Sequence, residues 1–199
     1  MPLLGPDAVP PGPARRVLVA GTSGSGKTTL ARRIAARLNV PHVEIDGLFH
    51  GPGWTPDPDF VSEVGRFSAG PAWVTEWQYT SVRPLLAERA DLLVWLDHPR
   101  RLVLWQVVRR TLRRRLRREQ LWNGNVEPPL WTVLTARDHI IRWSWRTHRQ
   151  TAPRVEDLLR SRLDLPVVRL RSRAAARRWL SRLAQQSASS QTDGGSRRA

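Results

Sequence analysis

The chain has 199 residues, a formal net charge of +16 and no cysteine. This length favours a single domain, and the lack of cysteine excludes disulfides and thiolate metal sites. The charge is uneven, since residues 1–98 carry nine basic and ten acidic side chains and residues 99–199 carry 24 basic and seven acidic ones. The second half is therefore expected to meet phosphate-rich partners, either nucleotides or nucleic acid.

The two ends of the chain have the composition of unfolded segments. Residues 1–14 hold five prolines and no basic side chain, which matches neither a signal peptide nor a membrane span. We therefore expect a cytoplasmic location with no membrane association. The Pro-rich extension 1–14 and the Ser/Gln/Gly-rich tail 185–199 are predicted to be disordered. One folded domain is thus predicted over residues 15–184.

The first folded segment carries the pattern G-x-x-x-x-G-K-[ST] in the setting that this pattern needs. Residues 16–20 form an apolar run typical of a buried parallel strand. Apolar side chains at 30, 34 and 38 predict an amphipathic helix that begins near Thr28. The strand–loop–helix order predicts a loop that binds nucleotide phosphates. Its expected ligand-binding residues are Gly21, Ser23, Gly24, Ser25, Gly26, Lys27, Thr28 and Thr29.

The single lysine of the chain lies in this loop, whereas the other 32 basic residues are arginine. The compact ammonium of Lys27 fits between β- and γ-phosphate oxygens, and a planar guanidinium is too wide for that gap. The Thr28 hydroxyl is placed to ligate Mg²⁺. The expected ligands are therefore ATP and Mg²⁺, and Lys27 is a candidate catalytic residue.

Strands and helices alternate along the rest of the chain. Strands are predicted at residues 42–45, 73–76, 91–96 and 166–170, and helices at 59–67, 81–90, 99–118, 137–159 and 174–183. This alternation predicts an α/β protein of the P-loop NTPase class, with a parallel sheet covered by helices on both faces. Ligands in such sheets bind beyond the carboxyl ends of the strands, where Asp46, Glu76 and Asp97 are expected. Glu76 can hold a Mg²⁺-bound water, because hard cations favour carboxylates, whereas Asp97 is as well explained as a helix cap.

The predicted helix 99–118 is strongly basic. It carries nine arginines in residues 100–118 and no acid, so mutual repulsion argues against a merely solvated charged face. Trp105, Val108, Leu112 and Leu116 form its apolar stripe, and Trp105 is expected in the core.

Taken in order, the motifs resemble those of adenylate-kinase-like (nucleoside-monophosphate-kinase-like) small P-loop proteins. More narrowly, they resemble the bacterial group labelled DNA topology modulation proteins, over residues 15–184. One departure falls at Glu76-Trp77, where that group usually has Asp-Gly. The motifs that carry the resemblance are GTSGSGKTT (21–29), IDGLF (45–49), GW (53–54), WVTEWQY (73–79), LDHP (96–99), EQLWNGN (119–125) and IIRWSW (140–145).

The resemblance implies roles for further residues. A carboxylate at Asp46 would orient or deprotonate the phosphate acceptor, although a loop or capping aspartate is the alternative. A basic helical lid is expected at about 110–136, and the helix after it would supply Arg142, unless Asp138 simply pairs with that arginine. Tyr79 and Arg83 lie beyond the third predicted strand, where an acceptor would sit. The lid arginines expected to reach phosphate are Arg110, Arg113 and Arg114, with Arg113, Arg114 and Arg142 as catalytic candidates.

These observations favour a phosphotransferase that moves the ATP γ-phosphoryl group to a small acceptor, such as a nucleoside monophosphate. The alternative is an ATP-dependent, nucleic-acid-associated regulator, or a weak ATPase if the Trp77 indole occludes the acceptor site. The basic second half is expected to give weak, sequence-independent nucleic-acid binding. The sequence leaves the oligomeric state open.

Overall fold

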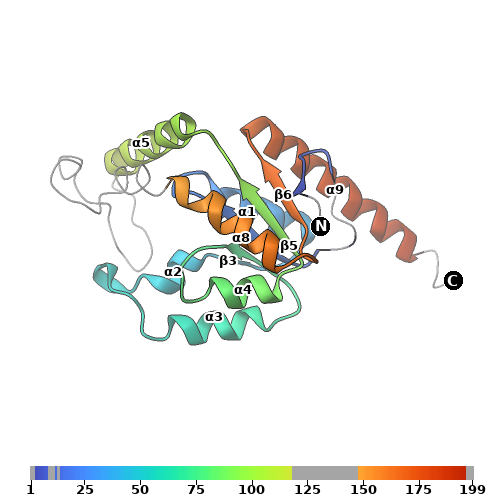
Figure 1. The fold of residues 1–199 in the computed structure, drawn as a ribbon, viewed down its shortest axis with the longest axis horizontal. Helices are drawn as coiled ribbons and strands as arrows, with labels where there is room; N and C mark the ends of the chain where they lie inside the picture. The colour runs from blue at the N-terminus through green and yellow to red at the C-terminus, as the bar shows by residue number, and fades with distance from the viewer. Residues whose placement is uncertain (1–2, 9–11, 13, 118–147, 196–199) are drawn as a thin grey trace.

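The computed structural model describes residues 3–8, 12, 14–117 and 148–195 (Figure 1). Within these ranges the strands form one sheet in the order β1-β6-β5-β2-β4-β3, and every neighbouring pair is parallel. The α/β class and the parallel sheet predicted from the sequence are therefore confirmed. The strands are β1 (Leu3–Leu4), β2 (Arg16–Gly21), β3 (His42–Val43), β4 (Trp73–Glu76), β5 (Leu92–Leu96) and β6 (Val167–Leu170).

Helices cover both faces of the sheet because the central strands are apolar on both sides. Val17 and Val19 of β2 point into one core with α1 and α9, whereas Leu18 and Ala20 point into the other core with α3, α4 and α8. Figure 1 shows α4 and α8 together on one side of the sheet. The helices are α1 (Lys27–Leu38), α2 (Ile45–Phe49), α3 (Phe60–Ser68), α4 (Arg83–Arg89), α5 (Arg100–Arg117), α8 (Thr151–Ser161) and α9 (Arg173–Gly195), with 3₁₀ turns η1 (Pro52–Trp54) and η3 (His148–Gln150).

The N-terminal extension differs from its prediction. Leu3 and Leu4 pair with Val167 and Val168, so the Pro-rich segment supplies the edge strand β1. Asp7 then anchors the segment to α9, because its carbonyl accepts a hydrogen bond from Arg182 Nη1 at 2.6 Å. A two-residue strand is too short to give an alternating pattern, which explains why composition alone predicted disorder.

Two further boundaries differ from expectation. The predicted strand 42–45 ends at Val43, and α2 begins at Ile45, so Asp46 lies on a helix. The Glu76 carboxylate accepts a hydrogen bond from the Ile45 N–H at 3.2 Å, which holds the chain where it turns. The helix expected at 174–183 extends to Gly195, into the predicted disordered tail.

The helix predicted at 137–159 is only partly within the described ranges. There it consists of the 3₁₀ turn η3 followed by α8 from Thr151. None of the helices that the structure describes is both long and apolar enough to cross a membrane.

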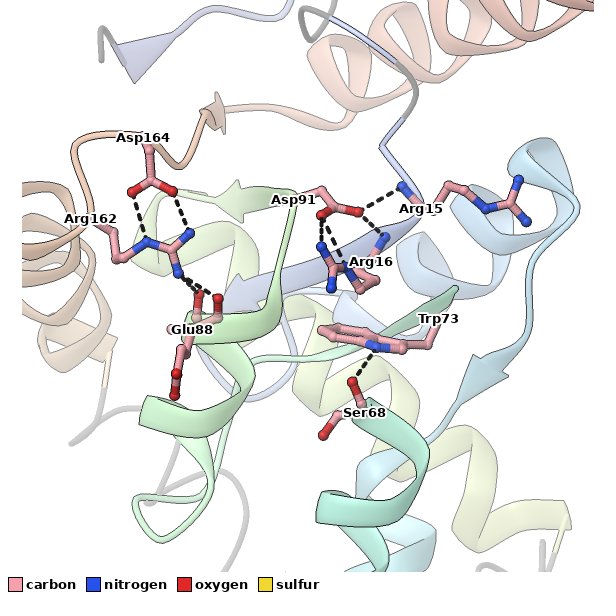
Figure 2. A network of polar contacts seen from close by, with 9 residues as sticks. Arg15, Arg16, Ser68, Trp73, Glu88, Asp91, Arg162 and Asp164 are labelled. Atoms are coloured by element: carbon pink, nitrogen blue, oxygen red, sulfur yellow. Dashed lines mark hydrogen bonds and ion pairs between the residues drawn. The ribbon is translucent and has the colours of Figure 1, made fainter. Parts of the chain in front are cut away.

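Charged side chains join the elements at the amino ends of the strands (Figure 2). The Arg16 guanidinium bonds Asp91 Oδ1 at 2.6 Å, and the backbone N–H of Arg16 donates to Asp91 Oδ2 at 2.8 Å. These contacts join the starts of β2 and β5. This edge is opposite the one where the glycine loop follows β2, so the network supports the sheet without entering the candidate site.

Candidate functional site

The glycine loop between β2 and α1 has the backbone that its sequence demands. Gly26 is the N-cap of α1 with φ 97°, and Gly24 has φ 81°, a left-handed region that side chains rarely adopt. At Gly24 an added Cβ would lie 2.0 Å from Val107 Cγ2. Glycine is therefore required there both by conformation and by the close approach of α5. The loop amides that precede α1 and the start of that helix form the setting in which anions bind.

Helix α5 packs on this loop through a face that the sequence analysis did not predict. Val103, Val107 and Thr111 are buried, whereas Trp105 is 50% exposed and Leu112 is 43% exposed. The expected stripe through Trp105 and Leu112 is therefore wrong as a buried face. The physical reason is space, because only small side chains fit where α5 approaches Gly24.

Polar contacts connect the same helix to the loop and to α9. With the Gln106 amide oriented to satisfy both of its ends, the nitrogen donates to the Gly24 carbonyl at 2.7 Å and the oxygen accepts from Arg173 Nε at 2.9 Å. The Trp105 ring has guanidinium carbons of Arg109 and Arg173 at 5.2 and 5.3 Å from its centre. An exposed indole with two arginines therefore lies beside the phosphate loop.

Lys27 lies close enough to Asp46, Glu76 and Arg110 for their charges to act on its ammonium. Its ammonium donates to the Thr22 carbonyl at 3.3 Å, across its own loop. Burial lowers the pKa of Lys27, the positive charge of Arg110 lowers it further, and the negative charges of Asp46 and Glu76 oppose this shift. The structure thus brings together four residues that the sequence analysis had selected separately: Lys27, Asp46, Glu76 and Arg110.

The Asp46 carboxylate is held from the chain segment after β4. Its Oδ1 accepts a hydrogen bond from the Tyr79 hydroxyl at 2.6 Å and another from Gln78 Nε2. Burial and the nearby charge of Asp46 raise the pKa of Tyr79 far above its usual value, so this hydroxyl stays protonated as a donor. Among the described residues, both of these bonds fall on Oδ1.

Aromatic rings surround this carboxylate. Phe49 stacks on Tyr79 with centroids 4.1 Å apart, and Phe60 meets the edges of both rings at 5.1 Å. His50 Nε2 lies 3.3 Å from the Tyr79 hydroxyl. Tyr79 itself has φ 61°, an uncommon conformation for a side chain of its size. Packing against Phe49 and Phe60 therefore holds the Tyr79 ring in place, and the Tyr79 hydroxyl orients the Asp46 carboxylate through its hydrogen bond.

Glu76 is more buried than predicted, and both of its carboxylate oxygens already accept hydrogen bonds. It is almost fully buried, and its two oxygens accept hydrogen bonds from His42 Nε2 at 3.3 Å and the Ile45 N–H at 3.2 Å. Burial alone would raise the pKa of Glu76, but the bonds from His42 and Ile45 outweigh it and lower the pKa. The carboxylate is thus ionised beside Lys27, where the predicted contact to a Mg²⁺-bound water remains a prediction.

The residues that the structure describes include no group of three or more His, Cys, Asp or Glu placed to hold a metal ion. Mg²⁺ commonly binds proteins through one or two side-chain oxygens together with substrate phosphates and water. Thr28, the second residue of α1, and Glu76 are the residues suited to that arrangement. Of the other predicted residues, Ser23 lies in the glycine loop and Thr29 lies on the exposed side of α1. The Asp97 carboxylate forms an ion pair with Arg169 at 2.6 Å.

The Trp77 indole is hydrogen-bonded to the first residue of α4. Its Nε1 donates to the Arg83 carbonyl at 3.1 Å, and its rings pack against the core under α3 and α4. The tryptophan that replaces the glycine of the resembling group therefore fastens the start of α4.

Several predicted lid residues cannot be placed. Arg113 lies on the exposed side of α5, whereas the Arg114 side chain, Arg142 and the lid beyond Arg117 lie outside the described residues. Sequence reasoning also missed Gln78, Gln106 and Arg173. Only their places next to motif residues or on the basic helix could have drawn attention to them.

The parallel sheet, the glycine loop after β2 and the lysine at the start of α1 define a P-loop NTPase fold. The family model described as "ATPase family associated with various cellular activities (AAA)" matches residues 17–52, the stretch that contains this loop. A comparison with curated protein sequences finds no match to this chain.

Among solved structures, shikimate kinase from Acinetobacter baumannii in complex with shikimate is similar, with 18% identity and a TM-score of 0.51 over 88% of this chain and 94% of that chain. A gluconokinase from Sinorhizobium meliloti 1021 has 18% identity and a TM-score of 0.48 over 90% of this chain and 97% of the other. The first likeness shows the fold, in agreement with the kinase-like architecture expected from the sequence. The resemblance to DNA topology modulation proteins remains a prediction.

Proposed function

We propose that this protein is an ATP-dependent phosphotransferase whose acceptor is a hydroxyl group of a small molecule. The observation that carries the proposal is the Asp46 carboxylate, which Tyr79 and Gln78 hold by Oδ1 in the electrostatic neighbourhood of Lys27. A hydroxyl acceptor must lose a proton as it attacks phosphorus, and a carboxylate held in place can take that proton.

The nature of the base decides between acceptor classes. A nucleoside monophosphate attacks through a phosphate oxygen that is already ionised near neutral pH, so it has no need of Asp46 as a base. The alternative of a weak ATPase, which the sequence linked to the Trp77 indole, predicts ADP formation that no acceptor stimulates. The lack of any need for a base with an ionised acceptor favours a hydroxyl acceptor over the nucleoside monophosphate suggested by the sequence resemblance.

The reaction can be written from these positions. The acceptor oxygen forms a bond to the γ-phosphorus, the bond from that phosphorus to the β,γ-bridging oxygen breaks, and ADP leaves. The acceptor proton passes to Asp46 Oδ2. Lys27 and Arg110 offset the negative charge on the transferred group, which is the main way that enzymes speed phosphoryl transfer. Thr28 and Glu76 would hold Mg²⁺ when it binds with ATP, and the ion would add charge neutralisation at the phosphates.

The test is ADP formation from Mg-ATP with a panel of acceptors that includes shikimate, gluconate, glycerol and AMP. In the Asp46→Asn variant we expect kcat to fall by about 10²- to 10⁴-fold, the usual contribution of a general base. The affinity for a non-hydrolysable ATP analogue should change little, because Asp46 faces the acceptor. Asp157→Asn is the matched control, since this exposed aspartate on α8 pairs only with Arg160 among the described residues.

Two results would contradict the proposal. The first is an Asp46→Asn variant that turns over its acceptor at the wild-type rate, which would leave the carboxylate with a structural role. The second is a wild-type protein whose ADP formation is not stimulated by any hydroxyl acceptor in the panel.

A further inference from the structure

Two arginines lie at the starts of neighbouring helices on the loop side of the sheet. Arg83 is the first residue of α4, and Arg154 is in the first turn of α8. Only Arg83 was expected near the acceptor from the sequence. Figure 1 shows α4 and α8 on the same face of the sheet.

The packing of the two helices places these ends near each other. Val82 and Leu86 of the α4 segment share one apolar core with Val155 and Leu158 of α8. At the other ends of these helices, Arg162 Nη1 donates to the carbonyls of Ala87 and Glu88 at 2.6 and 2.8 Å. Figure 2 shows Arg162 beside Glu88. The helices therefore run side by side in the same direction, with their first turns toward the phosphate loop.

Contacts at both helix starts connect this pair of arginines to the candidate site. The Thr151 hydroxyl at the start of α8 lies 3.5 Å from the Thr22 hydroxyl of the phosphate loop. The Arg83 N–H donates to the Tyr79 carbonyl at 3.1 Å, and the Tyr79 hydroxyl bonds Asp46. The two arginines thus lie at helix starts that contact the phosphate loop and the segment that holds the Asp46 carboxylate.

Neither guanidinium has a carboxylate partner in the part of the chain that the structure describes. Arg83 Nη2 donates to Thr80 Oγ1 at 2.9 Å, and Arg154 Nη2 donates to Gln150 Oε1 at 2.8 Å. Near the other ends of these helices, Arg162 pairs with Asp164 at 2.6 Å. Partial burial lowers the pKa of Arg83, and the positive charge of Arg154 lowers it further.

Holding two positive charges together without a counter-ion is unfavourable, and an anion between them removes the repulsion. Guanidinium groups suit this role because they bind carboxylates and phosphates with two parallel hydrogen bonds. The neutral partners Thr80 and Gln150 keep both side chains in place without neutralising them.

We propose that Arg83 and Arg154 bind an anionic group of the acceptor, either a carboxylate or a phosphomonoester. This inference rests on the proposed function and narrows its substrate class. The acceptor is then a hydroxy acid or a phosphorylated alcohol, with its hydroxyl at Asp46 and its anion at the two arginines. A neutral polyol satisfies only the first of these sites.

The experiment measures melting temperature with the phosphate loop filled by a saturating Mg²⁺-bound, non-hydrolysable ATP analogue, so that added anions cannot compete there. Gluconate is compared with glucose, and glycerol 3-phosphate with glycerol, at equal ionic strength. The variants are Arg83→Gln and Arg154→Gln. Arg160→Gln is the control, because this exposed arginine of α8 loses the same charge while pairing only with Asp157 among the described residues.

In the wild type we expect at least one anionic probe to stabilise the protein more than its neutral partner, and the effective pair identifies the anion as carboxylate or phosphate. Each Gln variant should weaken that probe by about tenfold or more, as expected for the loss of a hydrogen bond between charged groups. Arg160→Gln should behave as the wild type. Because Arg154 is exposed, its substitution should leave folding intact and keep the result interpretable if Arg83→Gln is unstable.

Equal shifts for charged and neutral probes in the wild type would overturn the inference, as would Gln variants that retain the full anion effect. Failure of the proposed phosphotransferase function would be detected by a different measurement. It would appear as an absence of acceptor-stimulated ADP formation, whatever the melting temperatures show. An active enzyme with unchanged KM for an anionic acceptor in Arg83→Gln and Arg154→Gln would overturn only the anion site.

Discussion

The contact between Gly24 and Val107 gives a prediction that tests how the phosphate loop is supported. In Gly24→Ala the new methyl group would lie 2.0 Å from Val107 Cγ2, and the residue would keep φ near 81°. The left-handed conformation costs an alanine about 1–2 kcal/mol. Overpacking against a rigid, fully buried valine costs about 1–3 kcal/mol more. We therefore expect the free energy of unfolding to fall by about 2–5 kcal/mol.

A double-mutant cycle separates the two contributions. Val107→Ala removes the atom that the new methyl group would meet, at its own cost of about 1.6 kcal/mol for two methylene equivalents plus the cavity. In that background Gly24→Ala should cost only the conformational part, about 1–2 kcal/mol. The difference is a coupling energy between the loop and α5 of about 1–3 kcal/mol.

Urea unfolding with linear extrapolation measures all four proteins. Gly65→Ala is the control for the glycine substitution, since Gly65 lies within α3 and an added Cβ there meets nothing within 4 Å. That change should stabilise the protein by about 0.5–1 kcal/mol. If Gly24→Ala costs as much in the Val107→Ala background as in the wild type, the close packing of α5 on the loop is refuted.

Three further predictions concern ligand, pH and salt. Mg-ATP should raise the melting temperature through ligand-linked stabilisation, and both Lys27→Ala and Lys27→Arg should remove most of the shift. Equal shifts in all three proteins would exclude Lys27 as a phosphate ligand. Burial raises the pKa of Asp91, but the contacts with Arg16 outweigh burial and lower it. The ionised Asp91 therefore stabilises the fold at pH values above the pKa of an ordinary aspartate, and this stabilisation is lost as the pH falls through the pKa of Asp91 in the folded protein. The difference in unfolding free energy between wild type and Asp91→Asn should therefore shrink as pH drops from about 5 to about 2, and a difference that grows would reverse the assigned sign. ADP formation should persist above physiological ionic strength while DNA retention disappears, because counterion release drives the latter; turnover that requires DNA and vanishes with it would favour the regulator.

The sequence predicted the central part of this fold because each element there has a strong local signal. The apolar runs of β2 and β5 indicate buried strands, and the glycine loop determines the turn from β2 into α1. Asp46 was expected at the correct edge, since topology places the carboxyl ends of parallel strands together. The hydrogen bond from Tyr79 that orients Asp46 could not be obtained from a local pattern.

The errors have a common physical origin in tertiary contacts. The apolar spacing of α5 favoured Trp105 and Leu112 as its buried face, but the close approach to Gly24 selects Val103 and Val107 instead. Arg154 gave no signal among so many arginines, because its importance depends on the packing of α8 beside α4. Periodicity shows which side chains are apolar, whereas the neighbouring element decides which of them fit.

The edge strand β1 has a consequence for how the protein can be handled and altered. Val167 and Val168 would present unpaired backbone groups on an apolar strand if Leu3 and Leu4 were removed. Such edges recruit other chains, so a version begun at Arg15 should be prone to self-association even with an intact phosphate loop. Because β1 and β6 are separated by most of the chain, β1 can pair with β6 only after β6 has been synthesised. During synthesis β6 therefore depends on the residues that emerged first, and a bulky fusion next to Leu3 would disturb the far rim of the sheet.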